Sequence, residues 1–211
     1  MPPSADRPLT FTQQARRQQL IEVTVAAIAE VGYARCSLQH IADAAGITKA
    51  AVIYHFPTRN ALVKAAYDHV IGQLVDHVGA RVAAAEGPAA AVEAYVMGML
   101  EHLTARPDRI RMITEALDSS GTGIDDRADR PARWRPLADL IEAAVAAGEY
   151  REGIDARAVA VGLGGAIDGL LAEFLDDPGF DAVGAGVGLL DLLRPGLSTP
   201  ERGSASRTNL W

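Results

Sequence analysis

The chain has 211 residues, of which 49% are hydrophobic and 5% aromatic, and its formal net charge is −7. This apolar content excludes a wholly disordered chain, and the abundance of Ala, Leu, Glu and Arg favours helix over strand. The single cysteine, Cys36, excludes an internal disulfide, and no signal-peptide or membrane-spanning segment stands out. We therefore expect an all-α cytoplasmic protein with no membrane partner, metal or cofactor, and with Cys36 as a small buried packing residue.

The charge is distributed unevenly along the chain. Residues 1–70 hold seven Lys/Arg against five Asp/Glu, a net charge of +2, whereas the other 141 residues hold 13 basic and 22 acidic groups, a net charge of −9. A polyanion such as DNA is attracted by positive potential and repelled by negative potential. Only the N-terminal segment is suited to nucleic acid.

Three helices are expected at the start of the chain. Apolar residues at spacings of three and four predict the first over Gln13–Val31, where Gly32 ends it. Ser37 precedes LQHIADAA and Thr48 precedes KAAVIYHF, and a hydroxyl before a helix accepts a hydrogen bond from an unpaired N–H of its first turn. Gly46, between the two segments, can adopt the positive φ of a sharp turn. The pattern predicts a helix-turn-helix.

The rest of the chain is expected to be helical as well. Thr58 follows Pro57 and can cap a long helix from Arg59 through Ala85. Proline, glycine and aspartate then predict helices near residues 88–105, 107–118, 131–148, 155–176 and 181–194. The polar segment 119–130 is a long loop that could act as a lid. The expected organisation is a flexible arm (1–12), a helix-turn-helix domain (13–57), a helical ligand-binding and dimerisation domain (58–194) and a disordered tail (195–211).

The helix-turn-helix also carries the residue types that DNA binding requires. The second helix of such a unit enters the major groove, so short, polar or cationic residues should face outward and phosphate donors should flank it. Each of these residues alone is more often a surface charge or part of a core, but the capped pair of helices favours DNA binding. The residues selected on this basis are Ser37, Gln39, Thr48, Lys49, Tyr54, His55 and Arg59.

Residues 14–66, above all IADAAGITKAAVIYHFPTRNAL, resemble the N-terminal domain of the TetR family of bacterial one-component transcriptional regulators. The resemblance implies a homodimer with a three-helix DNA-binding head and a larger ligand-binding body, usually a repressor until a small molecule binds. The chain departs from the family at Ile53, where an aromatic residue is frequent, and at Ala50, where glycine is common. We expect base recognition to depend on methyl contacts to thymine and on Lys49. The DNA contacts that the resemblance implies are Ser37, Thr48, Lys49, Ala50, Ala51, Tyr54, His55 and Arg59.

Glycines interrupt the apolar runs between residues 155 and 194. Each costs about 1 kcal/mol relative to alanine within a helix, which makes sense if the missing side chains let two helices approach closely. A symmetric dimer would then bind an inverted-repeat operator. Packing within one chain is the alternative. The expected dimer interface consists of Ile167, Leu170, Leu171, Phe174, Leu189, Leu190 and Leu193.

A ligand pocket is expected in the C-terminal domain, where polar residues accompany apolar ones on the same helices. Polar groups that become buried need partners, and a ligand can supply them. Ordinary core packing also explains the apolar members. A cationic ligand in an acidic pocket and an aromatic acid held by Arg111 both remain open. The candidate pocket residues are Tyr95, Met99, His102, Met112, Glu115, Trp134 and Asp168.

The sequence thus predicts a ligand-responsive transcriptional regulator, with a repressor as the first hypothesis. An effector-independent DNA-binding protein or an activator is the alternative. An enzyme is disfavoured because no Ser/His/Asp grouping, metal-ligand spacing or phosphate-cradling glycine loop stands out. The expected partners are a double-stranded DNA operator, an unknown small-molecule effector and a second copy of the chain.

Overall fold

The computed structural model describes residues 10–118, 122, 124 and 130–199, the side chains of residues 118 and 130–132 excepted. No strand occurs among these residues, which confirms the all-α fold class. The helices are α1 (Phe11–Val31), α2 (Leu38–Ala44), α3 (Lys49–His55), α4 (Arg59–Ala83), α5 (Pro88–Thr104), α6 (Pro107–Asp118), α7 (Arg130–Ala146), α8 (Ala156–Asp176) and α9 (Ala182–Leu197).

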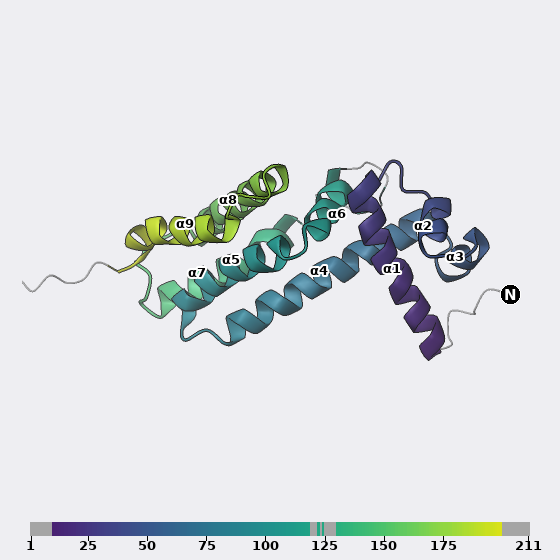
Figure 1. Ribbon diagram of the computed structural model, residues 1–211. Helices are drawn as coiled ribbons and strands as arrows, with labels where there is room; N and C mark the ends of the chain where they lie inside the picture. Colours follow the sequence, from purple (N-terminus) through teal and green to yellow (C-terminus); the bar gives the residue numbers. More distant parts are fainter. Residues whose placement is uncertain (1–9, 119–121, 123, 125–129, 200–211) are drawn as a thin grey trace, which may run out of the picture.

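Figure 1 shows α1, α2 and α3 gathered at one end of an elongated molecule, and we call these helices the head. The long helix α4 runs from the head alongside α5, and we call the helices α5 to α9 the body. Helices α8 and α9 lie side by side on the side of the body away from α4. The architecture is therefore a three-helix head on a helical body, as expected.

Two hydrophobic cores correspond to the head and the body, and α4 belongs to both. Its first half contributes Leu62 and Val70 to the head core, and its second half contributes Leu74 and Val78 to the body core. Helix α6 is shared in the same way, because Ile110 packs in the body while Met112 is fully buried in the head. Movement of the head relative to the body would have to displace both helices.

The start of α1 differs from the expected boundary. The Thr10 hydroxyl accepts the Gln13 N–H at 3.3 Å, and the Gln13 side chain accepts the Thr10 N–H at 2.9 Å, which together make a capping box. Phe11 and Thr12 therefore belong to the helix and not to a flexible arm. Residues 1–9 of the expected arm lie outside the described residues.

The end of α9 also differs, because the helix continues through Pro195 to Leu197. Leu197 is only 9% exposed in the body core, and its carbonyl oxygen accepts the Arg151 N–H at 2.8 Å. These contacts hold a last turn in which Pro195 cannot donate a hydrogen bond. The tail therefore cannot begin at residue 195, and residues 200–211 lie outside the described part.

Two smaller expectations concern the middle and the start of the chain. Most of the expected 119–130 loop lies outside the described residues, so its suggested function as a lid stays a prediction, and Arg130 already opens α7. Cys36 is completely buried in the head core, and burial raises the pKa of its thiol. It is a packing residue, as the sequence predicted.

Candidate DNA-binding head and effector site

The turn between α2 and α3 has the geometry that the sequence predicts. The Ser37 hydroxyl accepts the His40 N–H at 3.1 Å, and the Thr48 hydroxyl accepts the Ala51 N–H at 3.2 Å, so each helix has an N-cap. Gly46 has φ +66°, and a Cβ added there would meet no atom within 4 Å. The backbone conformation alone, and not a lack of space, requires glycine in this turn.

Helix α3 presents one face to solvent. Lys49 and Ala50 are exposed in its first turn, and one turn later Ile53 is 42% and Tyr54 46% exposed. On its other side Val52 is completely buried in the head core. The exposed face combines a cation, a small apolar side chain, a branched apolar side chain and a phenol. These groups can contact phosphate, thymine methyl groups and base edges.

Ile53 was not among the residues selected from the sequence, although its family position was noted. Ile53 is a branched apolar residue on a short helix, and it does not pack in the head core. That combination was the signal that could have identified it. The selected Ala51 and His55 are half-buried, which places them at the margin of the α3 face.

Contacts from α1 hold α3 in place, and sequence reasoning did not find them. The Gln13 side-chain amide donates to the Tyr54 hydroxyl at 3.1 Å. The Arg17 guanidinium donates to the carbonyl oxygen of His55 and lies 4.0 Å from the centre of the Phe56 ring. Burial lowers the pKa of His55, and Arg17 and Arg16 lower it further. His55 is therefore neutral near pH 7 and can take part in hydrogen bonds without adding charge.

Arg59 was expected to contact DNA, but the head uses its guanidinium internally. It donates to the Tyr33 carbonyl oxygen at 2.8 Å and lies 3.9 Å from the centre of the Tyr33 ring. We therefore omit Arg59 from the candidate DNA-binding surface. Ser37 and Gln39 remain exposed beside α3, and Gln39 donates to the Asp43 carboxylate at 2.7 Å.

Neither cleft found in the structure is lined by the residues expected to form a ligand pocket as a group, and two of them, Met112 and Glu115, lie beside the head. Met112 is completely buried in the head core. The Glu115 carboxylate accepts the Tyr33 N–H at 2.8 Å. Both lie on α6, which belongs to both cores, so a helix expected to line only a body pocket also packs against the head.

The other candidate pocket residues are dispersed over the body. Asp168 is exposed and pairs with Arg133 at 3.4 Å. The Arg157 guanidinium lies 4.9 Å from the centre of the Trp134 ring. Tyr95 and Met99 are half-buried against the body core, where burial raises the pKa of Tyr95. Local helical spacing indicated which residues share a helix but not which helices face one another.

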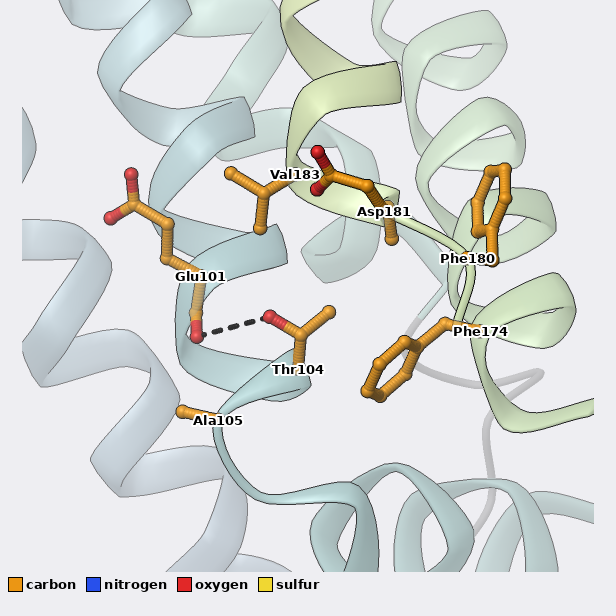
Figure 2. A pocket seen from close by; sticks show the side chains of 8 residues that line it. Glu101, Thr104, Ala105, Phe174, Phe180, Asp181 and Val183 are labelled. Carbon is orange, nitrogen blue, oxygen red and sulfur yellow. Dashed lines mark hydrogen bonds between the residues drawn. The ribbon is translucent and has the colours of Figure 1, made fainter. Parts of the chain in front are cut away.

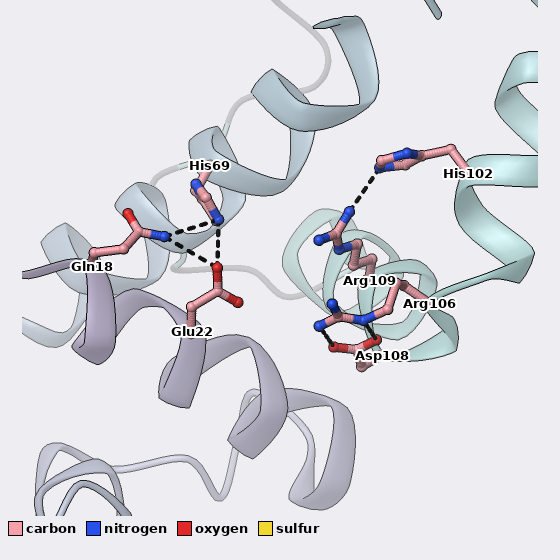
Figure 3. Close-up of polar contacts among 7 residues, drawn as sticks. All are labelled: Gln18, Glu22, His69, His102, Arg106, Asp108 and Arg109. Carbon is pink, nitrogen blue, oxygen red and sulfur yellow. Dashed lines mark hydrogen bonds and ion pairs between the residues drawn. The ribbon is translucent and has the colours of Figure 1, made fainter. Parts of the chain in front are cut away.

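Two polar groups tie helices together close to the head, and Figure 3 shows both. His69 of α4 lies 2.8 Å from the Glu22 carboxylate of α1. His102 of α5, the last of the pocket candidates, lies 2.8 Å from the Arg109 guanidinium of α6. The arginine can only donate, so the facing His102 nitrogen must be unprotonated. Burial lowers the pKa of His102, and the charges of Arg109, His77 and Arg106 lower it further.

Two clefts are the candidate small-molecule sites in the described part of the chain. The first, of about 410 Å³, lies between the end of α5 and the α8–α9 connection, and Figure 2 shows Thr104, Phe174 and Val183 among the residues that line it. The second, of about 370 Å³, lies between the head and the body, and Arg35, Arg111 and Glu115 are among its lining residues. Of the residues expected to form a ligand pocket, only Glu115 is among the described residues that line either cleft.

Three residues of the expected dimer interface are buried within their own chain. Ile167 is 2%, Leu171 5% and Leu190 8% exposed, because they pack in the core of their own chain. The other four are partly buried against the same core: Leu170, Phe174, Leu189 and Leu193. The leucine-rich stripes of α8 and α9 face inward, so packing within one chain explains them.

The opposite face of α8 and α9 is apolar and open. Val161 is 52%, Val187 47% and Leu192 76% exposed. A Cβ added to Gly165 or Gly169 would meet no atom within 4 Å, so packing inside the chain does not require these glycines. In the described part of the chain, α8 alone is long and apolar enough to cross a membrane, yet only 22% of its apolar window is buried. An apolar, glycine-containing face that the chain leaves open explains why α8 is so apolar and yet mostly unburied.

Comparison with known proteins agrees with this geometry. Residues 20–66 match the family model "Bacterial regulatory proteins, tetR family". The chain is 34% identical over 93 residues to the HTH-type transcriptional regulator BetI of Serratia proteamaculans, covering 43% of this chain and 47% of that protein. It is 38% identical over 77 residues to BetI of Yersinia pestis, covering 36% and 39%. The chain thus spans less than half the length of these curated relatives.

Solved structures share the fold over most of the chain. The transcriptional regulator FadR from Bacillus subtilis, in complex with stearoyl-CoA, has a TM-score of 0.74 at 19% identity and covers 85% of this chain and 98% of its own. A TetR transcription regulator from Haloarcula marismortui has a TM-score of 0.74 at 20% identity, covering 88% and 100%. At these identities the likeness concerns the fold alone.

The capped helix pair, its positive-φ glycine and the exposed α3 face define a helix-turn-helix DNA-binding domain. The match of residues 20–66 to the TetR family model confirms the resemblance seen in the sequence. The family and the matched relatives are transcriptional regulators and not enzymes, as expected.

Proposed function

We propose that this chain is a ligand-responsive transcriptional repressor that acts in the cytoplasm. It binds an inverted-repeat operator as a homodimer and leaves it when a small molecule binds. The observation that carries the proposal is the exposed α3 face, with Lys49, Ala50, Ile53 and Tyr54 on a capped helix of a TetR-type domain. Ser37 and Thr48 flank this face, and their hydroxyls can donate to phosphate while their oxygens accept the cap bonds.

The open face of α8 and α9 supports the dimer. Apolar faces of this kind mark interaction sites when a chain leaves them uncovered. Glycines that nothing inside the chain requires would let the backbones of two copies approach closely, with Val161, Val187 and Leu192 packed between them. Two heads related by two-fold symmetry require an operator with two inverted half-sites.

The clefts support a small-molecule effector. Their volumes, about 410 Å³ and 370 Å³, lie in the range of small-ligand sites. FadR of Bacillus subtilis, which shares the fold, was solved in complex with stearoyl-CoA. Ligand binding would release the protein from the operator if the ligand favoured an arrangement of the two heads that does not fit the spacing of the DNA grooves.

A gel shift with the DNA upstream of its own gene tests the proposal. The purified chain should retard this fragment and not an unrelated fragment of equal length at the same salt concentration. Addition of the effector should then release the DNA. Retardation of both fragments with equal affinity would contradict operator recognition, and a specific shift that no small molecule alters would favour the effector-independent alternative.

A further inference from the structure

The cleft of about 370 Å³ joins the head to the body, and its walls come from both. Helix α1 and the turn after it contribute Ile28, Val31 and Arg35, whereas α6 contributes Arg111 and α8 contributes Leu175. A molecule in this cleft would touch the DNA-binding unit and the body at once. The 410 Å³ cleft has no head residue in its lining.

The two arginines of the cleft have hydrogen-bond donors to spare. Arg35 uses its Nε to donate to the Val31 carbonyl oxygen at 2.8 Å, which leaves the two terminal nitrogens of its guanidinium. Arg111 is exposed, and no hydrogen bond or ion pair engages it among the residues that the structure describes. A guanidinium presents paired N–H donors whose spacing matches the two oxygens of a carboxylate.

The acidic residues of the cleft limit the charge of its ligand. Glu115 already accepts the Tyr33 N–H, and Glu30 is exposed on α1. Two guanidiniums against two carboxylates leave the cleft without net charge, and this disfavours a dianion such as a phosphate monoester more strongly than a monoanion. The buried Ile28 and the partly buried Val31 and Leu175 offer an apolar surface beside the arginines. A monocarboxylate with a small apolar body satisfies both features.

We propose that this cleft binds a small organic monocarboxylate, whose oxygens are held by Arg35 from the head and Arg111 from the body. The binding claim stands on the cleft alone. Its consequence for operator DNA rests on the proposed function: a ligand held by both parts fixes the head on the body and thereby weakens operator binding.

Calorimetric titration of the full chain with benzoate and hexanoate tests the binding claim, with benzamide and hexanamide as neutral controls of the same shape. We expect saturable binding of at least one acid at one site per chain, at least tenfold tighter than its amide. Arg111→Gln and Arg35→Gln should each weaken binding about 10- to 100-fold, because each removes a charged hydrogen-bond donor. Arg135→Gln, which removes the same charge from α7 outside the cleft, should leave the affinity unchanged.

The thermal midpoints of the three variants, measured beside the titrations, show that each is folded. Equal affinity for acid and amide, unchanged binding in both cleft variants, or no binding of either acid up to about 10 mM would overturn the site. Operator gel shifts separate this inference from the proposed function. If the wild type binds benzoate but recognises no operator, the function fails and the site stands. If benzoate binds and operator affinity changes less than about fivefold, the coupling to DNA is wrong.

Discussion

The Glu115 carboxylate of α6 accepts the backbone N–H of Tyr33 at 2.8 Å, and this hydrogen bond joins the body to the turn after α1. Glu115→Ala should lower the free energy of unfolding by about 1–2 kcal/mol, because a half-buried N–H loses a charged acceptor. Operator affinity should change as well, since the head loses a contact that sets its position.

Glu149→Ala is the matched control for this prediction. Glu149 accepts the Ala89 N–H at 2.8 Å, the same kind of bond but within the body. Denaturant titration and gel shifts of both variants make the comparison. Equal effects of the two substitutions on operator affinity would show that Glu115 does not control the head.

Lys49→Ala should weaken operator binding without changing the stability of the fold. Lys49 is exposed at the start of α3, where removal of one phosphate contact should reduce the slope of log K against log salt by about one unit. Fluorescence anisotropy with labelled operator over a salt series measures this slope. Lys64→Ala, which removes an exposed lysine paired with Asp68 on α4, is the control and should leave the slope as it is.

Gly46→Val should destabilise the head and abolish operator binding, since a β-branched residue is strained at φ +66°. The expected cost is about 1–3 kcal/mol. Gly46→Asn should cost less, because asparagine tolerates this conformation better and the site has room for a side chain. Thermal unfolding of the two variants orders them, and a valine variant as stable as the asparagine variant would refute the assigned turn geometry.

Leu192→Glu should dissociate the homodimer without unfolding the chain. The side chain is 76% exposed in the single chain, so the charge harms only an interface that would bury it. Val75→Glu on α4, at a site 62% exposed, is the control and should remain dimeric. Sedimentation velocity measures both, and a Leu192→Glu dimer of wild-type strength would place the interface elsewhere.

Acidification should destabilise the chain in part through His102. The folded-state pKa of this residue is lowered from 6.5, so the unfolded chain takes up the proton first. Its contribution to stability is therefore present above about pH 6.5 and is lost as the pH falls through the lower folded pKa. His102→Gln should therefore show a smaller drop in thermal midpoint between about pH 8 and pH 5 than the wild type does.

The helices and the helix-turn-helix could be predicted because their signals are local. Ser37 and Thr48 cap the two helices they precede, and Gly46 has the positive φ that the turn requires. Boundaries shifted where a distant contact decided them, as the buried Leu197 holds the end of α9 beyond Pro195. Such contacts leave no periodic trace in the sequence.

The candidate sites were harder to predict because they depend on which helix faces which. Apolar periodicity identified Leu171 and Leu190 as facing a partner, but that partner is the core of the same chain, and the open face carries Leu192. Arg59 has the right charge for DNA, yet the Tyr33 ring and carbonyl oxygen engage it. Only tertiary structure separates a stripe that packs internally from one left exposed.

The central claim is that two copies of the chain present their α3 faces to an inverted repeat. Selection of bound sequences from a random DNA pool, with the mass of the resulting complex determined by light scattering, tests it most directly. We predict enrichment of a palindromic site with half-sites about 34 Å apart or at a larger phased spacing, bound by an even number of protomers, and loss of that enrichment with Lys49→Ala. Enrichment of a single unpaired half-site bound by one protomer, or no enrichment from the pool, would contradict the account.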